Sequence, residues 1–156
     1  MKRPIRKVAV LGSGVMGSRI ACHFAGIGCE VLLLDIVPRE LTAKEEATGK
    51  TLEHPAVRNR LVNDALKFAL KSNPYPIYQK SFADRITTGN FDDDMHRISE
   101  CDWTIEVVIE NLDIKQKVYA NVEQHRKSGS LISSNTSSIP MAKLIEGRSE
   151  DFRKHF

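Results

Sequence analysis

A glycine-rich turn between a buried strand and a helix constrains this sequence most. Residues 12–17 read GSGVMG, with the spacing G-x-G-x-x-G. The segment before them, Lys7–Leu11 (KVAVL), is short, apolar and rich in β-branched residues, as expected of a strand buried on both faces. A second strand of this kind, Glu30–Leu34, ends in Asp35. Between the turn and the second strand, apolar residues recur every three or four positions and predict an amphipathic helix: Met16, Ile20, Phe24 and Ile27.

Each glycine of the turn has its own expected task. Gly12 permits the tight turn, Gly14 lets the backbone approach a diphosphate, and Gly17 lets the helix pack closely on the strand. The first helical residues, Val15 and Met16, offer free N–H groups and partial positive charge to phosphates. We therefore predict a dinucleotide site at this turn, the alternative being a glycine turn without a ligand.

Asp35 is the expected ribose ligand. It stands 18 residues beyond Gly17, at the end of the second strand. A carboxylate there accepts hydrogen bonds from both ribose hydroxyls and repels a 2′-phosphate, which favours NAD over NADP. Arg39 lies nearby and would favour NADP, but an arginine at a helix start is usually solvated. Asp35 could instead be a turn or cap residue.

The rest of the chain alternates strand-like and helix-like segments. Strands are expected at 86–88, 103–109 and 130–133, and helices at 112–127 and 140–146. This alternation predicts an α/β fold of the Rossmann type, with a doubly wound, mostly parallel sheet covered on both faces.

A longer polar region, residues 38–73, follows the second strand. Thr42 and Glu45 have the spacing of a capping box, and Pro55 suits the start of another helix. We predict a helical arm of two helices here. The second helix is expected to carry one apolar face: Val57, Leu61, Ala65 and Phe68.

Composition bounds the function classes. With 156 residues and 17.5 kDa, the chain fits one domain. The net charge is +3 without a block of five like charges, so neither a nucleic-acid nor a membrane partner is required. Three cysteines without C-x-x-C spacing favour reduced thiols and a cytoplasmic location. The histidines lack metal-site spacing, and the acidic run 92–94 suits a helix start better than a metal cluster, so we expect no metal.

Polar residues follow the two later strands. Glu110 and Lys115 come after the strand at 103–109, and SSNTSS follows the next strand at 133–138. Ligands of parallel sheets bind at the carboxyl ends of the strands, so these groups are expected near the nicotinamide end of the cofactor and a substrate hydroxyl. The alternative for the serine-rich stretch is a loop with a helix cap.

At this level of detail the sequence resembles the NAD-binding domain of the L-3-hydroxyacyl-CoA dehydrogenases, enzymes of fatty-acid β-oxidation. The resemblance rests on three segments in order: KVAVLGSGVMGSRIACHFAGIGCEVLLLDI, IEVVIENLDIKQKVYANVE and SLISSNTSSI. It spans nearly the whole chain and is far more specific than the glycine spacing alone. The region 38–91 is less diagnostic, although its length is similar to that of the helical arm that contacts coenzyme A in this family.

The resemblance implies roles for single residues. The three glycines would hold the diphosphate of NAD and Asp35 its ribose, while Glu110 and Lys115 would lie near the nicotinamide half. Asn135 would help to place the nicotinamide. Ser137 would be the catalytic-site residue that hydrogen-bonds the hydroxyl or keto oxygen of the 3-hydroxyacyl-CoA substrate.

The family reaction transfers a hydride from C3 of a 3-hydroxyacyl-CoA to NAD⁺, with a histidine as general base. That histidine sits in a segment like G-x-H-F-F-N-P, whereas this chain ends in RKHF, with Arg153 where the glycine would stand two residues before His155. His155 could be the base, or a surface histidine at a strand edge; the residues from Asp151 onward show no helix cap or turn.

We therefore expect residues 1–156 to form an NAD-binding domain that is shortened at its C-terminal end and lacks the family's helical dimerisation domain. It should bind dinucleotide without turning over by itself, and the full-length protein should be a homo-oligomer. Two other functions stay open: a dehydrogenase of the same fold that acts on a 3-hydroxy acid without coenzyme A, and a non-catalytic dinucleotide-binding module.

Overall fold

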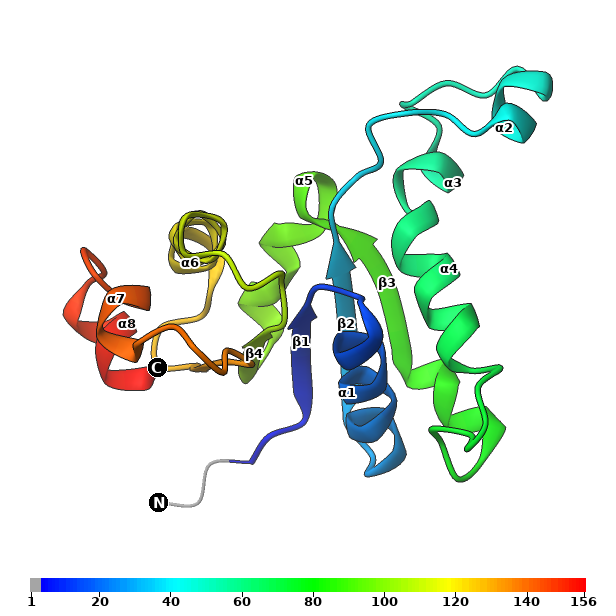
Figure 1. Ribbon diagram of the computed structural model, residues 1–156. Helices are drawn as coiled ribbons and strands as arrows, with labels where there is room; N and C mark the ends of the chain where they lie inside the picture. The colour runs from blue at the N-terminus through cyan, green and yellow to red at the C-terminus, as the bar shows by residue number, and fades with distance from the viewer. Residues whose placement is uncertain (1–3) are drawn as a thin grey trace.

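The computed structural model describes residues 4–156, which form a parallel five-stranded sheet with helices on both faces (Figure 1). The strand order is β3-β2-β1-β4-β5, and every neighbouring pair is parallel. The expected Rossmann-type α/β fold is confirmed. The strands are β1 (Lys7–Leu11), β2 (Glu30–Asp35), β3 (Ile86–Asn90), β4 (Trp103–Glu106) and β5 (Leu131–Ser134).

The order of the strands reverses at β1. The chain runs outward from β1 through β2 to β3, and then returns to place β4 on the other side of β1. Leu11 pairs with Leu34 of β2 and with Glu106 of β4, so the carboxyl ends of these three strands lie at one edge. A parallel sheet binds ligands at such a reversal, where the loops on either side diverge.

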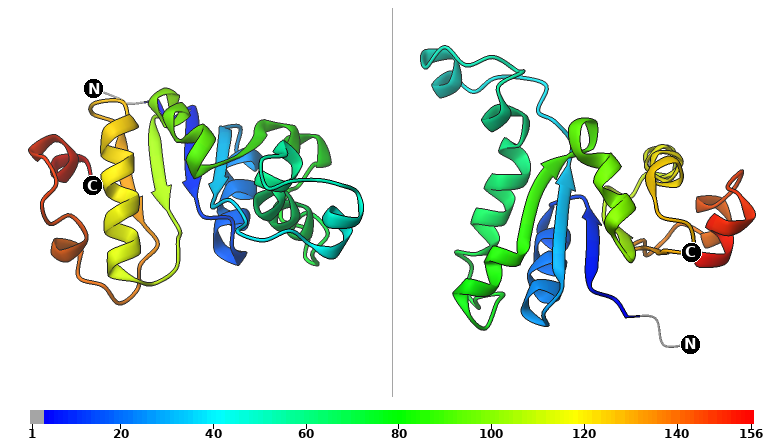
Figure 2. Two further views of the ribbon diagram at one scale, coloured as in Figure 1. Left: turned by 90° about the horizontal axis from the view of Figure 1, so that it is seen from above. Right: turned by 180° about the vertical axis from the view of Figure 1, so that it is seen from behind.

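Alternate residues of each strand face opposite sides of the sheet. Figure 2 shows the helices on these two sides from above and from behind. On one face, helices α1 (Val15–Gly26) and α4 (Arg60–Ala69) cover the sheet. The strand side chains buried beneath them are Val8, Val10, Val31, Leu33 and Ile105. The opposite face is covered by the 3₁₀ helix η2 (Met95–Glu100) and by α6 (Leu112–His125), over a second group: Ala9, Leu11, Leu32, Leu34 and Ile132.

The arm after β2 extends past the carboxyl ends of the strands, with α2 at its far end (Figure 1). The capping box at Thr42 and Glu45 is confirmed at the start of α2 (Ala43–Ala47). Two helices were expected in this region, but the structure has three, because α3 (Pro55–Arg58) ends before α4 begins.

The predicted apolar face of the arm is wrong. Leu61 and Phe68 are 37% and 76% exposed, whereas Val62 and Ala69 of α4 are buried. Val57 is buried as expected, but it belongs to α3. Because the helix breaks at Asn59, the helical phase set by Val57 does not continue into α4.

Several other boundaries differ from expectation by one or two residues, and two further differences are larger. The strand β4 ends at Glu106 instead of residue 109, since the Glu106 carboxylate accepts a hydrogen bond from the Val108 N–H and turns the chain out of the sheet. The C-terminal residues form a helix, α8 (Glu150–His155), whose Ser149 cap was overlooked in the sequence. The remaining elements are η1 (Lys80–Arg85), α5 (Phe91–Asp94), where the acidic run begins a helix as expected, and α7 (Met141–Leu144).

Candidate functional site

The turn from β1 into α1 is built around two crowded glycines. Gly12 has φ +106°, and a Cβ there would lie 2.6 Å from the Val107 carbonyl oxygen. A Cβ on Gly17 would collide with the carbonyl oxygen of Gly12. The Gly12 N–H also donates to the Leu34 carbonyl at 2.8 Å. The turn therefore closes only with glycine at both positions.

Gly14 differs from these two. A Cβ built on Gly14 meets no atom within 4 Å, so the space in front of this residue is open. Gly14 is the N-cap of α1, no side chain caps that helix start, and its first turn holds no acidic residue. Val15 and Met16, the first two helical residues, are 72% and 53% exposed. The corner thus presents uncapped N–H groups to open space, which suits a diphosphate.

Asp35 lies beside this corner at the end of β2. Its Oδ2 accepts hydrogen bonds from the backbone N–H of Ser13, at 2.7 Å, and from the Ser13 hydroxyl. Its Oδ1 accepts from the Ile36 N–H at 2.7 Å. The carboxylate is half-buried and is held against the glycine turn, where a ribose next to the diphosphate would reach it.

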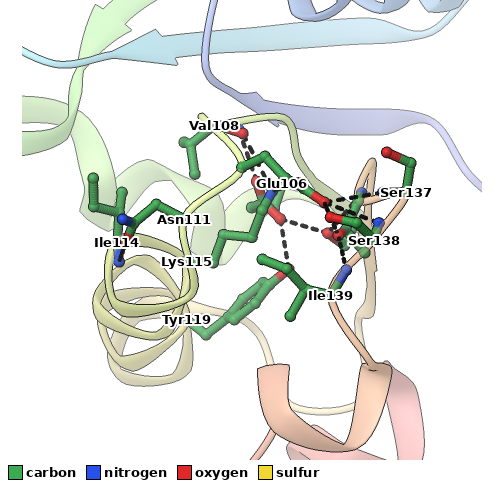
Figure 3. Close-up of polar contacts among 12 residues, drawn as sticks. Glu106, Val108, Asn111, Ile114, Lys115, Tyr119, Ser137, Ser138 and Ile139 are labelled. Carbon is green, nitrogen blue, oxygen red and sulfur yellow. Dashed lines mark hydrogen bonds and ion pairs between the residues drawn. The ribbon is translucent and has the colours of Figure 1, made fainter.

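A buried carboxylate marks the other side of the edge. Glu106, the last residue of β4, is completely buried. Its Oε1 accepts from Lys115 Nζ and from the Val108 N–H, both at 2.7 Å. Its Oε2 accepts from the Tyr119 hydroxyl at 2.7 Å and the Ser134 hydroxyl at 2.6 Å (Figure 3). This carboxylate therefore joins β4, α6 and β5.

Lys115 is nearly as buried, at 1% exposure. Besides Glu106, its ammonium meets the Val108 carbonyl at 3.2 Å and Glu110 Oε2 at 3.4 Å. The ammonium donates hydrogen bonds to Glu106 and to the Val108 carbonyl, and it forms an ion pair with Glu110. In this arrangement Lys115 links the end of β4 to the loop that follows it. Burial raises the pKa of the neighbouring Tyr119 hydroxyl above its usual range.

Glu110 holds the loop after β5. Its Oε1 accepts from the Thr136 hydroxyl at 2.6 Å, from the N–H groups of Ser137 and Ser138 at 3.2 and 3.1 Å, and from the Ser138 hydroxyl at 2.9 Å. The Thr136 hydroxyl, followed by the Ser138 hydroxyl and the two backbone N–H groups, lowers the pKa of Glu110 to about 2. Glu110 is therefore ionised at neutral pH and fixes the loop that carries Ser137.

The structure brings the sequence-predicted residues together in two groups. Gly12, Gly14, Val15, Met16, Gly17 and Asp35 surround the corner between β1 and β2. Glu110, Lys115, Asn135 and Ser137 lie on the loops after β4 and β5 and on the start of α6. The backbone N–H of Asn135 donates a hydrogen bond to the Glu106 carbonyl at 2.8 Å, which joins the loop after β5 to the end of β4.

Sequence reasoning placed Glu106 and Ser134 in the polar segments after two strands but gave neither an individual role, and it gave none to Tyr119. All three meet in this second group. The signal was available for Glu106, because a single acid inside an otherwise apolar strand has to find buried partners. Nothing in the sequence marked Tyr119, which occupies one of the apolar positions of an ordinary amphipathic helix.

His155 lies on helix α8, so its expected place at a strand edge is wrong. Its Nδ1 is 2.7 Å from the Asp151 carbonyl oxygen and 3.3 Å from Asp151 Oδ1, both in its own helix. Within residues 4–156, no three His, Cys, Asp or Glu side chains are grouped so that they could bind a metal ion. The same residues contain no helix long and apolar enough to cross a membrane.

Comparison with known proteins gives a consistent result. Residues 7–156 match the family described as 3-hydroxyacyl-CoA dehydrogenase, NAD binding domain. The chain belongs to this family. Its cofactor is accordingly NAD.

Individual relatives agree. A "Probable 3-hydroxyacyl-CoA dehydrogenase" of Bacillus subtilis is 53% identical over the whole chain, which covers 20% of that protein. One of the same name from Deinococcus radiodurans is 41% identical over 97% of the chain and 40% of its own length. Among solved structures, an (S)-3-hydroxybutyryl-CoA dehydrogenase from Ralstonia eutropha matches with a TM-score of 0.64 and 26% identity, over 95% of this chain and 47% of that one. The chain thus spans less than half the length of each of these proteins.

The residues present fit this cofactor. Gly14 leaves open space at an uncapped helix start, and Asp35 stands beside it. The structure therefore leaves open space beside a carboxylate on one side of the sheet reversal and presents polar loops on the other, as the binding of a dinucleotide across the reversal requires.

Proposed function

We propose that this chain is the cofactor-binding part of an NAD-dependent 3-hydroxyacyl-CoA dehydrogenase of fatty-acid β-oxidation. The observation that carries the proposal is the open space in front of Gly14, at an uncapped helix start and beside Asp35. The polar loops after β4 and β5 lie at the same edge of the sheet, as a dinucleotide that crosses the strand reversal requires.

The adenosine half of the cofactor is assigned to β1 and β2. The diphosphate would accept hydrogen bonds from the N–H groups of Val15 and Met16, with the charge of the helix start in support. Gly12 and Gly17 shape the turn. Asp35 would accept from the ribose hydroxyls, which excludes a 2′-phosphate by repulsion between like charges.

The nicotinamide half is assigned to the loops after β4 and β5. Asn135 would hydrogen-bond the carboxamide, with Glu110 and Lys115 close by. Ser137 would donate to the C3 oxygen of the substrate and orient C3 toward the ring. When bound, NAD⁺ supplies the hydride acceptor. The proton of the substrate hydroxyl needs a separate base, and we assign none among residues 4–156, since His155 contacts its own helix.

We extend the proposal to the setting of the protein. We expect 3-hydroxyacyl-CoA thioesters as substrates, a homo-oligomer as the full-length form, no nucleic-acid or membrane partner, and a cytoplasmic location. Support for the location comes from the cysteines, because Cys22, Cys29 and Cys101 are all buried free thiols.

Calorimetric titration with NADH and NADPH tests the cofactor site. NADH should bind this chain at least about tenfold more tightly than NADPH, because Asp35 repels the 2′-phosphate. Asp35→Ala should weaken the binding of NADH and reduce the difference between the affinities for NADH and NADPH. Asp64→Ala, at an exposed position on α4, is the matched control and should behave as the wild type. Equal binding of the two cofactors, or no effect of Asp35→Ala, would contradict the proposal.

Substrate class is tested on the NADH complex. Acetoacetyl-CoA should bind this complex, and acetoacetate without coenzyme A should not compete with it. With acetoacetyl-CoA present, the chain by itself should not oxidise NADH. Competition by acetoacetate alone would favour a dehydrogenase of the same fold that acts on a free 3-hydroxy acid. Robust turnover would show that these residues include an adequate base.

A further inference from the structure

Glu106 is the most connected buried charge at the candidate site. Its four side-chain hydrogen bonds come from Val108, Lys115, Tyr119 and Ser134, at 2.6 to 2.7 Å. Its backbone carbonyl accepts a fifth, from the Asn135 N–H at 2.8 Å. Every donor comes from one of the elements that border the nicotinamide half of the proposed site.

A buried ion pair of this kind is weak evidence for a role in stability. Desolvation of Glu106 and Lys115 offsets much of their attraction, and an apolar pair of similar volume often serves stability as well or better. What such a network provides, when each donor and acceptor is satisfied, is a fixed geometry. The elements held here are the loops that carry Glu110, Asn135 and Ser137.

Charge balance shows how the effect would reach the loops. Lys115 is shared by two carboxylates, with Glu106 at 2.7 Å and Glu110 at 3.4 Å. If Glu106 loses its charge, the ammonium is drawn toward Glu110. The ammonium pulls on Glu110 through Oε2, and a shift of this carboxylate also moves Oε1, which accepts hydrogen bonds from Thr136 and Ser138 in the loop after β5.

We propose that Glu106 is a positioning residue for the nicotinamide half of the cofactor. It acts through Lys115 on Glu110 and through Ser134 on the adjacent Asn135, and it does not itself touch the cofactor. The inference rests on the proposed function, because it requires nicotinamide between the loops after β4 and β5.

The test compares NADH with ADP-ribose, which lacks the nicotinamide, by calorimetry on the chain carrying Glu106→Gln. This variant keeps the shape of the side chain and removes its charge. NADH should bind about tenfold more weakly, while the affinity for ADP-ribose should stay within about twofold of the wild type. A merely structural role would weaken both ligands together.

Glu123→Gln is the matched control. Glu123 lies on the same helix as Lys115 and pairs with Arg148 at 2.9 Å and the Ser149 N–H at 2.8 Å, away from both loops. Its substitution should change neither affinity. If Glu106→Gln fails to fold, Ser134→Ala is measured in its place, because it removes one hydrogen bond of Glu106. It should also weaken NADH more than ADP-ribose, but by a smaller factor.

The outcomes separate this inference from the function on which it rests. Wild-type chain that binds neither ligand contradicts the proposed function. Wild-type chain that binds NADH no more tightly than ADP-ribose overturns the inference, since no nicotinamide subsite then exists. The inference is also overturned if Glu106→Gln and Ser134→Ala each lower the affinities for NADH and ADP-ribose by the same factor. It is overturned as well if these variants change neither affinity.

Discussion

The two sides of the sheet reversal solve the problem of positioning by different means. Between β1 and β2 the geometry is set by the backbone, because Gly12 and Gly17 allow approaches that no side chain would permit. Between β4 and β5 it is set by charge, with Glu106 and Lys115 at 0% and 1% exposure.

The difference teaches what each half can tolerate. A backbone turn of this kind fails by collision when a Cβ is added at Gly12 or Gly17, and pH does not change that collision. A network of buried charges fails when one member loses its partner or its ionisation, so it depends on protonation and on every member at once. The same edge of one sheet thus has one half fixed by backbone contacts and one half fixed by a network of charged and polar side chains.

The largest expected effect is on the charged half. Lys115→Met leaves the buried Glu106 side chain without its cation, and should lower the free energy of unfolding by about 3–5 kcal/mol. Denaturant unfolding followed by circular dichroism measures this change. Lys117→Met, at an exposed position of the same helix, should stay within about 0.5 kcal/mol of the wild type. Equal stability of the two variants would show that the pair is not held as described.

A smaller effect is expected on the backbone half. Gly17→Ala drives a methyl group into the carbonyl oxygen of Gly12, which belongs to the backbone, and should cost about 1–3 kcal/mol. Gly26→Ala, in the same helix but with no atom within 4 Å of its added Cβ, should be neutral or slightly stabilising. Thermal unfolding of both variants measures this difference in stability. Equal stability of Gly17→Ala and Gly26→Ala would show that the close approach at Gly17 does not exist.

The smallest effect concerns pH. The pKa of Glu110 is about 2 in the folded chain against 4.5 for the ordinary side chain, so its stabilising contribution is fully present above pH 4.5. That contribution is lost as pH falls from 4.5 toward 2. The stability difference between wild type and Glu110→Gln should therefore shrink over this range. A stability difference between wild type and Glu110→Gln that stays constant from pH 4.5 to 2 would contradict the assignment.

The backbone half was readable from the sequence and the charged half only in part. Glycines at fixed spacing between a strand and a helix predict the geometry of the turn, so the turn after β1 and the helix α1 could be predicted from the sequence. The partners of Glu106 come from positions 108, 115, 119 and 134, and only the packing of α6 and β5 against β4 brings them together. The exposed face of α4 was mispredicted for a related reason, since the break at Asn59 depends on local geometry that periodicity does not encode.

The central claim is that the open space at the start of α1 holds the diphosphate of NAD. Gly14→Ala tests it most directly, because the added methyl meets no protein atom within 4 Å and can collide only with a ligand. The account predicts an unchanged melting temperature and NADH affinity reduced by about tenfold or more. Wild-type affinity for NADH in a stable Gly14→Ala variant would contradict it.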